Sequence, residues 1–135
     1  MIAVYSVAEI RRAEEATGEE LSSGALMQRA ASGLARVLTA ELRSIRGRQV
    51  LLAVGSGNNG GDALWAGVRL LRRGVRVSAW RTAGTVHADG WAAFLAAGGR
   101  ELDALGALEA LPDVDLVVDG VLGIGGRGGL RGPVA

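Results

Sequence analysis

The sequence predicts an α/β fold: a Rossmann-like, doubly wound, mainly parallel sheet in an αβα three-layer sandwich, with two N-terminal helices. Two observations predict it. Short apolar runs alternate with stretches of helical periodicity, which is typical of parallel strands joined by right-handed crossover helices. Glycine-rich turns directly follow two of the apolar runs, and 22 of the 135 residues are glycine, more than twice the roughly 7% of average usage.

The first two elements are expected to be helices. Ser6 and Glu9 have the spacing of a capping box, which predicts a short helix over residues 7–16. Between Leu26 and Leu42 apolar residues recur every three or four positions, the pattern of a long amphipathic helix.

Continuous apolar runs predict strands that are buried on both faces. Gly74 stands where a helix is expected to stop. The expected strands are residues 49–54, 75–80 and 115–119, and the further helices are residues 62–73, 87–97 and, more weakly, 103–110.

Composition limits the class of protein. We expect one domain over residues 1–135, because this length leaves no room for a second core. A net charge of +1 gives no broad field for nucleic acid, and no apolar run reaches the roughly 18 residues of a membrane span. The absence of cysteine favours a cytoplasmic protein without thiolate metal sites.

Two glycine loops, residues 55–61 and 120–132, each follow a predicted strand. The carboxyl ends of parallel strands line the ligand crevice of an open sheet, so both loops can contribute to one site. The first loop also opens a helix, whose free amides favour a phosphate.

The first loop also fits the dinucleotide fingerprint G-x-G-x-x-G through Gly55, Gly57 and Gly60. The acidic residue that the fingerprint expects about 20 positions later is absent, and Trp80 and Arg81 stand there instead. An arginine in that place could meet a 2′-phosphate. An NADP-binding dehydrogenase domain is therefore one alternative, and simple tight turns are another.

Oxygen-bearing side chains gather around the same strand ends. Asn58, Asn59 and Asp62 crowd the first loop, and Asp119 ends an apolar strand. Such side chains can cap helices, and Asp62 could be the N-cap, but they are also suitable ligands for a hard cation or a ribose.

The segment from Gly55 to Asp62, together with Asp119 to Gly125, resembles the YjeF N-terminal domain family, the NAD(P)H-hydrate epimerases. The segments Leu26–Ala31 and Gly129–Pro133 extend the resemblance over almost the whole chain. It implies a repair enzyme that interconverts the R and S epimers of hydrated NADH and NADPH (NADHX and NADPHX).

The resemblance also implies roles for single residues. Asn59 and Asp119 would ligate a potassium ion. A homodimer and fusion to an ADP- or ATP-dependent dehydratase domain are further implications. The implied substrate contacts are Asn58, Asn59, Gly60, Gly61, Asp62, Gly123, Ile124, Gly125, Gly126, Arg127, Gly128 and Gly129.

No catalytic residue is assigned. The family's general-base aspartate follows a segment that would lie beyond Ala135, so the chain is expected to be incomplete at its C-terminus. Asp62 or Asp119 could take the base role, whereas His87, the sole histidine, is expected to serve an exposed structural role. A non-catalytic interaction module, as in scaffold proteins that resemble this family, is a further alternative.

Overall fold

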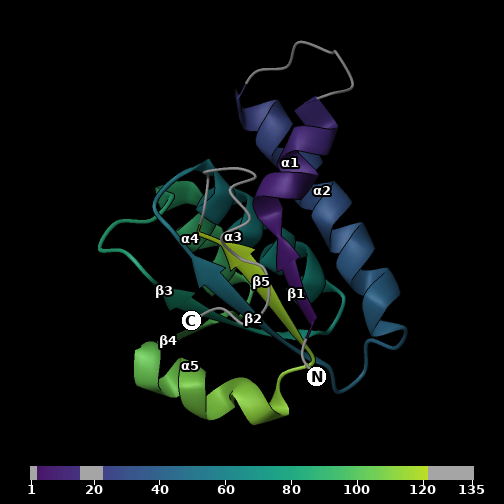
Figure 1. Cartoon of the computed structure of the whole chain (residues 1–135), viewed down its shortest axis with the longest axis vertical. Coiled ribbons are helices and arrows are strands. Elements are labelled where there is room, and N and C mark those ends of the chain that lie inside the picture. Colours follow the sequence, from purple (N-terminus) through teal and green to yellow (C-terminus); the bar gives the residue numbers. More distant parts are fainter. Residues whose placement is uncertain (1–2, 16–22, 122–135) are drawn as a thin grey trace.

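The computed structural model describes residues 3–15 and 23–121, and Figure 1 shows helices on both faces of a single sheet. The elements alternate as the sequence predicts. In chain order they are β1 (Ala3–Ser6), α1 (Val7–Glu15), α2 (Ser23–Leu42), β2 (Gln49–Val54), α3 (Asn58–Arg72), β3 (Arg76–Arg81), α4 (Ala88–Ala96), β4 (Arg100–Leu102), α5 (Ala104–Ala110), a 3-10 turn (Leu111–Asp113) and β5 (Leu116–Gly120).

All the described strand pairs are parallel, and the order across the sheet is β1-β5-β2-β3-β4. From β2 the chain moves outward through β3 to β4 and then returns to β5 on the other side of β2. The strand order therefore reverses between β2 and β5. Ligands of open α/β sheets bind at the carboxyl ends of the strands at such a point.

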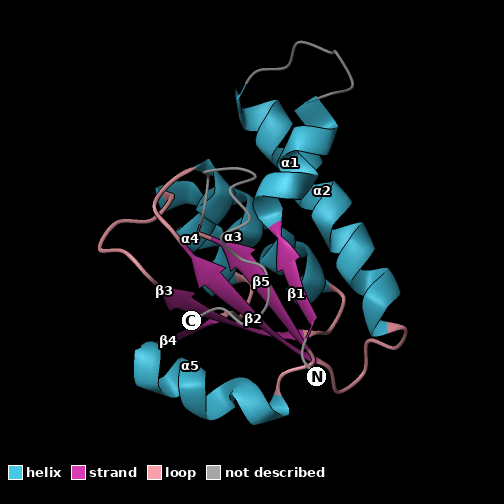
Figure 2. Cartoon of the chain, viewed as in Figure 1, coloured by secondary structure: helices cyan, strands magenta, loops and turns pink. Residues whose placement is uncertain are grey.

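The core has two layers, one on each face of the sheet. Leu52 and Val118 face the larger layer, which is covered by α1 to α4, while Leu51 and Val117 face a smaller layer beneath α5. Figure 2 shows α5 on its own side of the strands. Successive side chains of β2 are buried on opposite faces of the sheet, which explains why this strand is continuously apolar. The predicted three-layer sandwich is confirmed.

Two of the predictions are wrong. The helix expected to begin at residue 62 begins at Asn58, so the paired asparagines belong to its first turn. Three strands were expected, whereas the described residues form five, because β1 and β4 are the outer strands of the sheet. The expected stop of α3 is confirmed: Gly74 takes a φ of 98°, which a glycine adopts without strain.

Candidate functional site

The loop between β2 and α3 lies beside the carboxyl end of β5. Ala53 of β2 is in register with Asp119 of β5, and the Gly55 amide donates to the carbonyl of Gly120 over 3.2 Å. The first glycine loop and Asp119 therefore lie together at the carboxyl ends of two neighbouring strands, at the point where the strand order reverses. This confirms the predicted meeting of the two strand ends.

Close backbone approach explains two of the glycines. A Cβ on Gly60 would collide with the carbonyl of Gly55, and a Cβ on Gly120 would lie 2.8 Å from the Cβ of Ala63. Distances below 3.0 Å are essentially never seen for real Cβ atoms. These glycines thus allow the first turn of α3 to pack directly onto the ends of β2 and β5.

The N-cap residue of α3 provides no side-chain cap. Its N-cap residue is Gly57, in an extended conformation, and Asp62 lies one turn inside the helix. The N-cap role considered for Asp62 is therefore wrong. By contrast, α4 and α5 are capped by the side chains of His87 and Asp103, respectively. The first amides of an uncapped helix can be satisfied by water or by a ligand.

Asp62 is fully buried and forms a bidentate ion pair with Arg11 of α1. Arg11 Nε donates to Asp62 Oδ2 over 2.6 Å, and Arg11 Nη2 donates to Oδ1 over 2.8 Å. Such a pair stabilises the ionised carboxylate, which makes it a weak proton acceptor. The pair holds α1 against the first turns of α3. Sequence patterns do not indicate this pair, because the partners are 51 positions apart.

Asp119 is 2% exposed and Asn59 is 9% exposed. Asp119 Oδ1 accepts a hydrogen bond from the Val121 amide over 2.9 Å. A carboxylate withdrawn from water in this way gains from nearby positive charge or donors. The described residues include no group of three or more His, Cys, Asp or Glu that could hold a metal. A site here would instead combine carboxylate and amide oxygens, which suit a hard cation.

Two other predicted residues have structural contacts. His87 Nδ1 accepts from the Gly90 amide over 3.0 Å and so caps α4, which confirms a structural role, although the side chain is half-buried rather than exposed. Arg81, the candidate for a 2′-phosphate, donates to the carbonyl of Gly84, approaches Glu101 at 3.8 Å and lies over the Trp91 ring.

The remaining predicted contacts lie outside the described residues. They are Gly123, Ile124, Gly125, Gly126, Arg127, Gly128 and Gly129. Among the predicted contacts of the first loop, Asn58 is exposed, whereas Gly60 and Gly61 are buried. Gly61 is packed against Met27, since a Cβ there would lie 2.7 Å from the Met27 methyl group.

The switch point and the glycine-rich helix start place the chain in the class of doubly wound α/β proteins, whose ligands bind at this position. The family model described as "YjeF-related protein N-terminus" matches residues 23–135, and the chain belongs to this family.

Curated relatives agree with this assignment. The chain is 47% identical over 132 residues to the "Bifunctional NAD(P)H-hydrate repair enzyme Nnr" of Mycobacterium leprae, covering 94% of this chain and 27% of the relative. It is 45% identical over 127 residues to the "NAD(P)H-hydrate epimerase" of Clavibacter michiganensis, covering 90% and 53%, respectively. The chain thus spans about a quarter to a half of the length of these relatives.

A solved yeast structure, ynu0 (YNL200c), has the same fold. It superposes with a TM-score of 0.67 at 23% identity, over 99% of this chain and 60% of the yeast chain. Among the described helices, none has the length and apolar character that a membrane crossing requires.

Proposed function

We propose that this chain binds hydrated NADH or NADPH at the carboxyl edge between β2 and β5 and interconverts the R and S epimers. The observation that carries the proposal is the start of α3 at the N-cap Gly57, which supplies no side-chain cap and lies beside the buried Asp119 at the switch point. The relatives are named for NAD(P)H-hydrate epimerisation and repair, which supports the same substrate.

In this proposal the backbone amides at the start of α3 bind a phosphate of the dinucleotide. The helix dipole favours negative charge there, and the absence of side chains at the glycines admits the ligand close to the backbone. The exposed Asn58 adds an amide that can donate to or accept from the substrate. Residues 123–129, which lie outside the described residues, are proposed to complete the phosphate contacts.

Potassium is proposed as the cofactor, with Asn59 and Asp119 among its ligands. Their oxygen chemistry fits a hard monovalent cation, and the first turn of α3, which holds Asn59, packs against the end of β5, which holds Asp119. The ion would supply positive charge next to the buried carboxylate and the substrate's phosphates.

The proton-transfer step has no assigned residue among those described. The Arg11–Asp62 pair argues against Asp62 as the base, because the guanidinium stabilises the ionised form. In the proposal Asp62 acts on the substrate only through the position of the helix start. A cytoplasmic location, a homodimer and association with a dehydratase domain remain predictions.

An NADP-dependent dehydrogenase is less well supported, because Arg81 is engaged by Glu101, Gly84 and Trp91. The choice can be tested by titrating the chain with NADPHX and with intact NADP. We expect tighter binding of the hydrate, and tighter binding of NADP would favour the dehydrogenase.

Catalysis and the cation are tested together by following the equilibration of separated NADHX epimers in potassium or sodium chloride at equal ionic strength. We expect equilibration to be faster with the chain than without it, and faster in potassium. Asn59→Ala and Asp119→Asn should lose the potassium effect. Asp113→Asn, a change at an exposed aspartate, is the matched control.

The outcomes separate the parts of the proposal. Failure to bind the hydrate contradicts the proposed site. Binding without acceleration contradicts catalysis by this chain and leaves a binding module. Equal equilibration rates in potassium and in sodium chloride contradict only the proposal that potassium is the cofactor.

A further inference from the structure

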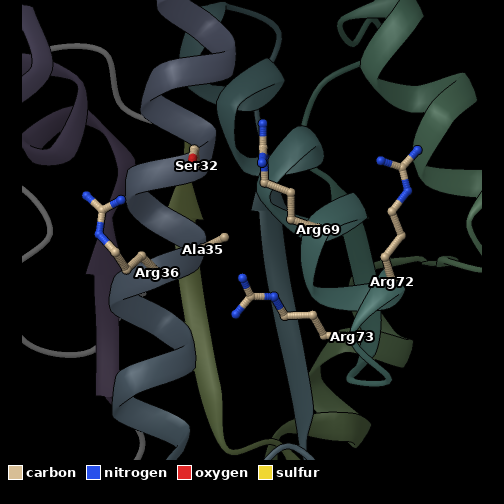
Figure 3. A pocket seen from close by; sticks show the side chains of 6 residues that line it. All are labelled: Ser32, Ala35, Arg36, Arg69, Arg72 and Arg73. Atoms are coloured by element: carbon tan, nitrogen blue, oxygen red, sulfur yellow. The ribbon is translucent and has the colours of Figure 1, made fainter.

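An arginine-lined groove lies between α2 and α3, away from the candidate site. Its volume is about 300 Å³, and its lining is Ser32, Ala35 and Arg36 from α2 with Arg69, Arg72 and Arg73 from the end of α3 (Figure 3). At 1.5 Å per residue, the 15-residue α3 places this groove roughly 20 Å from the glycine loop. We call it the arginine groove.

The charge in the arginine groove is of one sign. All four of its ionisable lining residues are arginines, although the whole chain has 15 basic and 14 acidic residues. Within the described residues, none of the four forms an ion pair. Clustered cations of this kind repel one another, and an anion between them lowers their energy.

Two of the arginines are held by neutral partners on α2. Arg69 Nη2 donates to Gln28 Oε1 over 3.3 Å, and Arg73 Nη1 donates to Thr39 Oγ1 over 3.5 Å. These contacts leave the positive charges in place and direct both side chains toward α2. Figure 3 shows Arg73 reaching toward α2 near Ala35, while Arg36 and Arg72 extend along the outer sides of the two helices.

The position of Arg69 and Arg72 in the last turn of α3 gives them a second role. Cations there offset the negative end of the helix dipole. That role does not explain Arg36, which lies in the interior of α2 and is exposed. Arg36 therefore adds positive charge at the rim of the groove (Figure 3) that no helix end requires.

We propose that the arginine groove binds a small, multiply charged phosphate, seated between Arg69 and Arg73 over Ser32 and Ala35. Guanidinium groups match phosphate oxygens in pairs, and the volume lies at the lower end of small-molecule sites. Among the described residues that line it, none has an aromatic or large apolar side chain on which a base could stack. The recognised chemistry is therefore a diphosphate, either free or as part of a nucleotide.

The test is an NMR titration of the whole chain with inorganic pyrophosphate and, separately, with ADP. We expect saturable amide shifts at Ser32, Ala35 and residues 69–73. The affinity should be similar for both ligands, because the described lining residues include no side chain that would hold a base. Binding of either ligand at the first glycine loop would shift residues 55–61 instead, which separates this proposal from the proposed function.

Variants show whether the ligands bind in the arginine groove or respond only to the diffuse positive charge of the surface. Arg69→Ala combined with Arg73→Ala should weaken the groove response at least about tenfold, because charge-assisted hydrogen bonds are lost. Ser32→Asp, which adds a negative charge to the lining of the groove, should weaken ligand binding similarly. Arg100→Ala removes an exposed arginine on the distant strand β4 and should leave affinity within about twofold.

Two results would overturn the proposal. One is the absence of saturable shifts at the groove residues with either ligand. The other is an equal loss of affinity in the Arg100→Ala control and in the groove variants, which would show a diffuse charge effect. A higher affinity for ADP than for pyrophosphate at the groove would assign it to a nucleotide rather than to free diphosphate.

Discussion

The two ends of α3 are built in opposite ways. At the N-terminal end, glycines bring backbone against backbone, and the fully buried Asp62 is paired with Arg11. At the C-terminal end, exposed or half-buried arginines stand beside an open groove. The comparison indicates that shape dominates the first end and charge the second. Substitutions should therefore cost stability at one end and change anion binding at the other.

The caps of the helix follow the same division. Near the C-terminus, the amides of Arg73 and Val75 both donate to the carbonyl of Leu70, and Gly74 turns the chain. All of these partners are local in sequence. At the N-terminus the N-cap Gly57 supplies no side-chain cap, and the described packing partners come from β2, β5 and α1. Local sequence therefore explains one end, and tertiary contacts explain the other.

The largest expected effect is that of Gly60→Ala. A Cβ at this position meets the backbone of Gly55, which cannot move aside as a flexible side chain could. We therefore expect a loss of more than about 3 kcal/mol in the free energy of unfolding. Chemical denaturation measures it. Gly57→Ala is the matched control, since its Cβ would meet nothing within 4 Å. Equal losses in the two variants would contradict the role given to backbone approach.

Arg11→Ala should have the next largest effect, because it leaves the Asp62 carboxylate buried without its guanidinium partner. Removing one member of a buried pair costs about 3–5 kcal/mol, and we expect roughly 2–3 kcal/mol here because Arg11 is 11% exposed and water can reach the gap. Denaturation experiments again provide the measurement.

The adjacent Arg12 is exposed, so Arg12→Ala is the control and should change stability by less than about 0.5 kcal/mol. The double variant Arg11→Met with Asp62→Leu should recover much of the loss, because no charge is left buried. If Arg11→Ala left the free energy of unfolding unchanged, the pair would not hold α1 against α3.

The arginines at the other end of α3 should matter much less for stability. Arg69→Ala and Arg72→Ala each remove a cation from the last turn, which is worth about 0.3–1 kcal/mol and less in high salt. Thermal unfolding at low and high ionic strength measures this. A loss of stability above about 2 kcal/mol that does not depend on salt would show that these arginines act through packing, as the residues at the N-terminal end do. It would contradict the contrast between the two ends of α3.

The smallest effect is expected at an exposed contact, Tyr5 Oη to Glu41 Oε1, 2.7 Å long. The hydrogen bond to Glu41, then partial burial, then the Glu41 charge raise the pKa of Tyr5 above 10.0. The protonated phenol is thus favoured in the folded state. Its contribution to stability is present below pH 10.0 and is lost as the pH rises through the raised pKa.

Tyr5 is the sole tyrosine, so an ultraviolet titration of phenolate formation reports on it directly. The midpoint should lie above 10.0 in the native chain and fall in Glu41→Ala. Tyr5→Phe should cost less than about 0.5 kcal/mol, since exposed pairs contribute little. A loss as large as that of Arg11→Ala would remove the contrast between exposed and buried pairs.

Periodicity predicted the elements that carry strong patterns. The long helix up to Leu42 and the strand Gln49–Val54 are present with these boundaries. The edge strands β1 and β4 were missed because they have only 4 and 3 residues, too few for a pattern, and pair at the margins of the sheet. The early start of α3 was missed because glycine and asparagine are poor helix formers, and only packing against β2 and β5 offsets this.

The sequence alone determined the α/β class, the strand-end position of the oxygen-bearing side chains and the resemblance to the YjeF N-terminal family, because periodicity and loop motifs are local. Only the tertiary structure decided that Asp62 pairs with Arg11 and that four arginines from two helices line one groove. These contacts join residues far apart in the chain. Their formation depends on how the helices pack across the sheet, which no local pattern encodes.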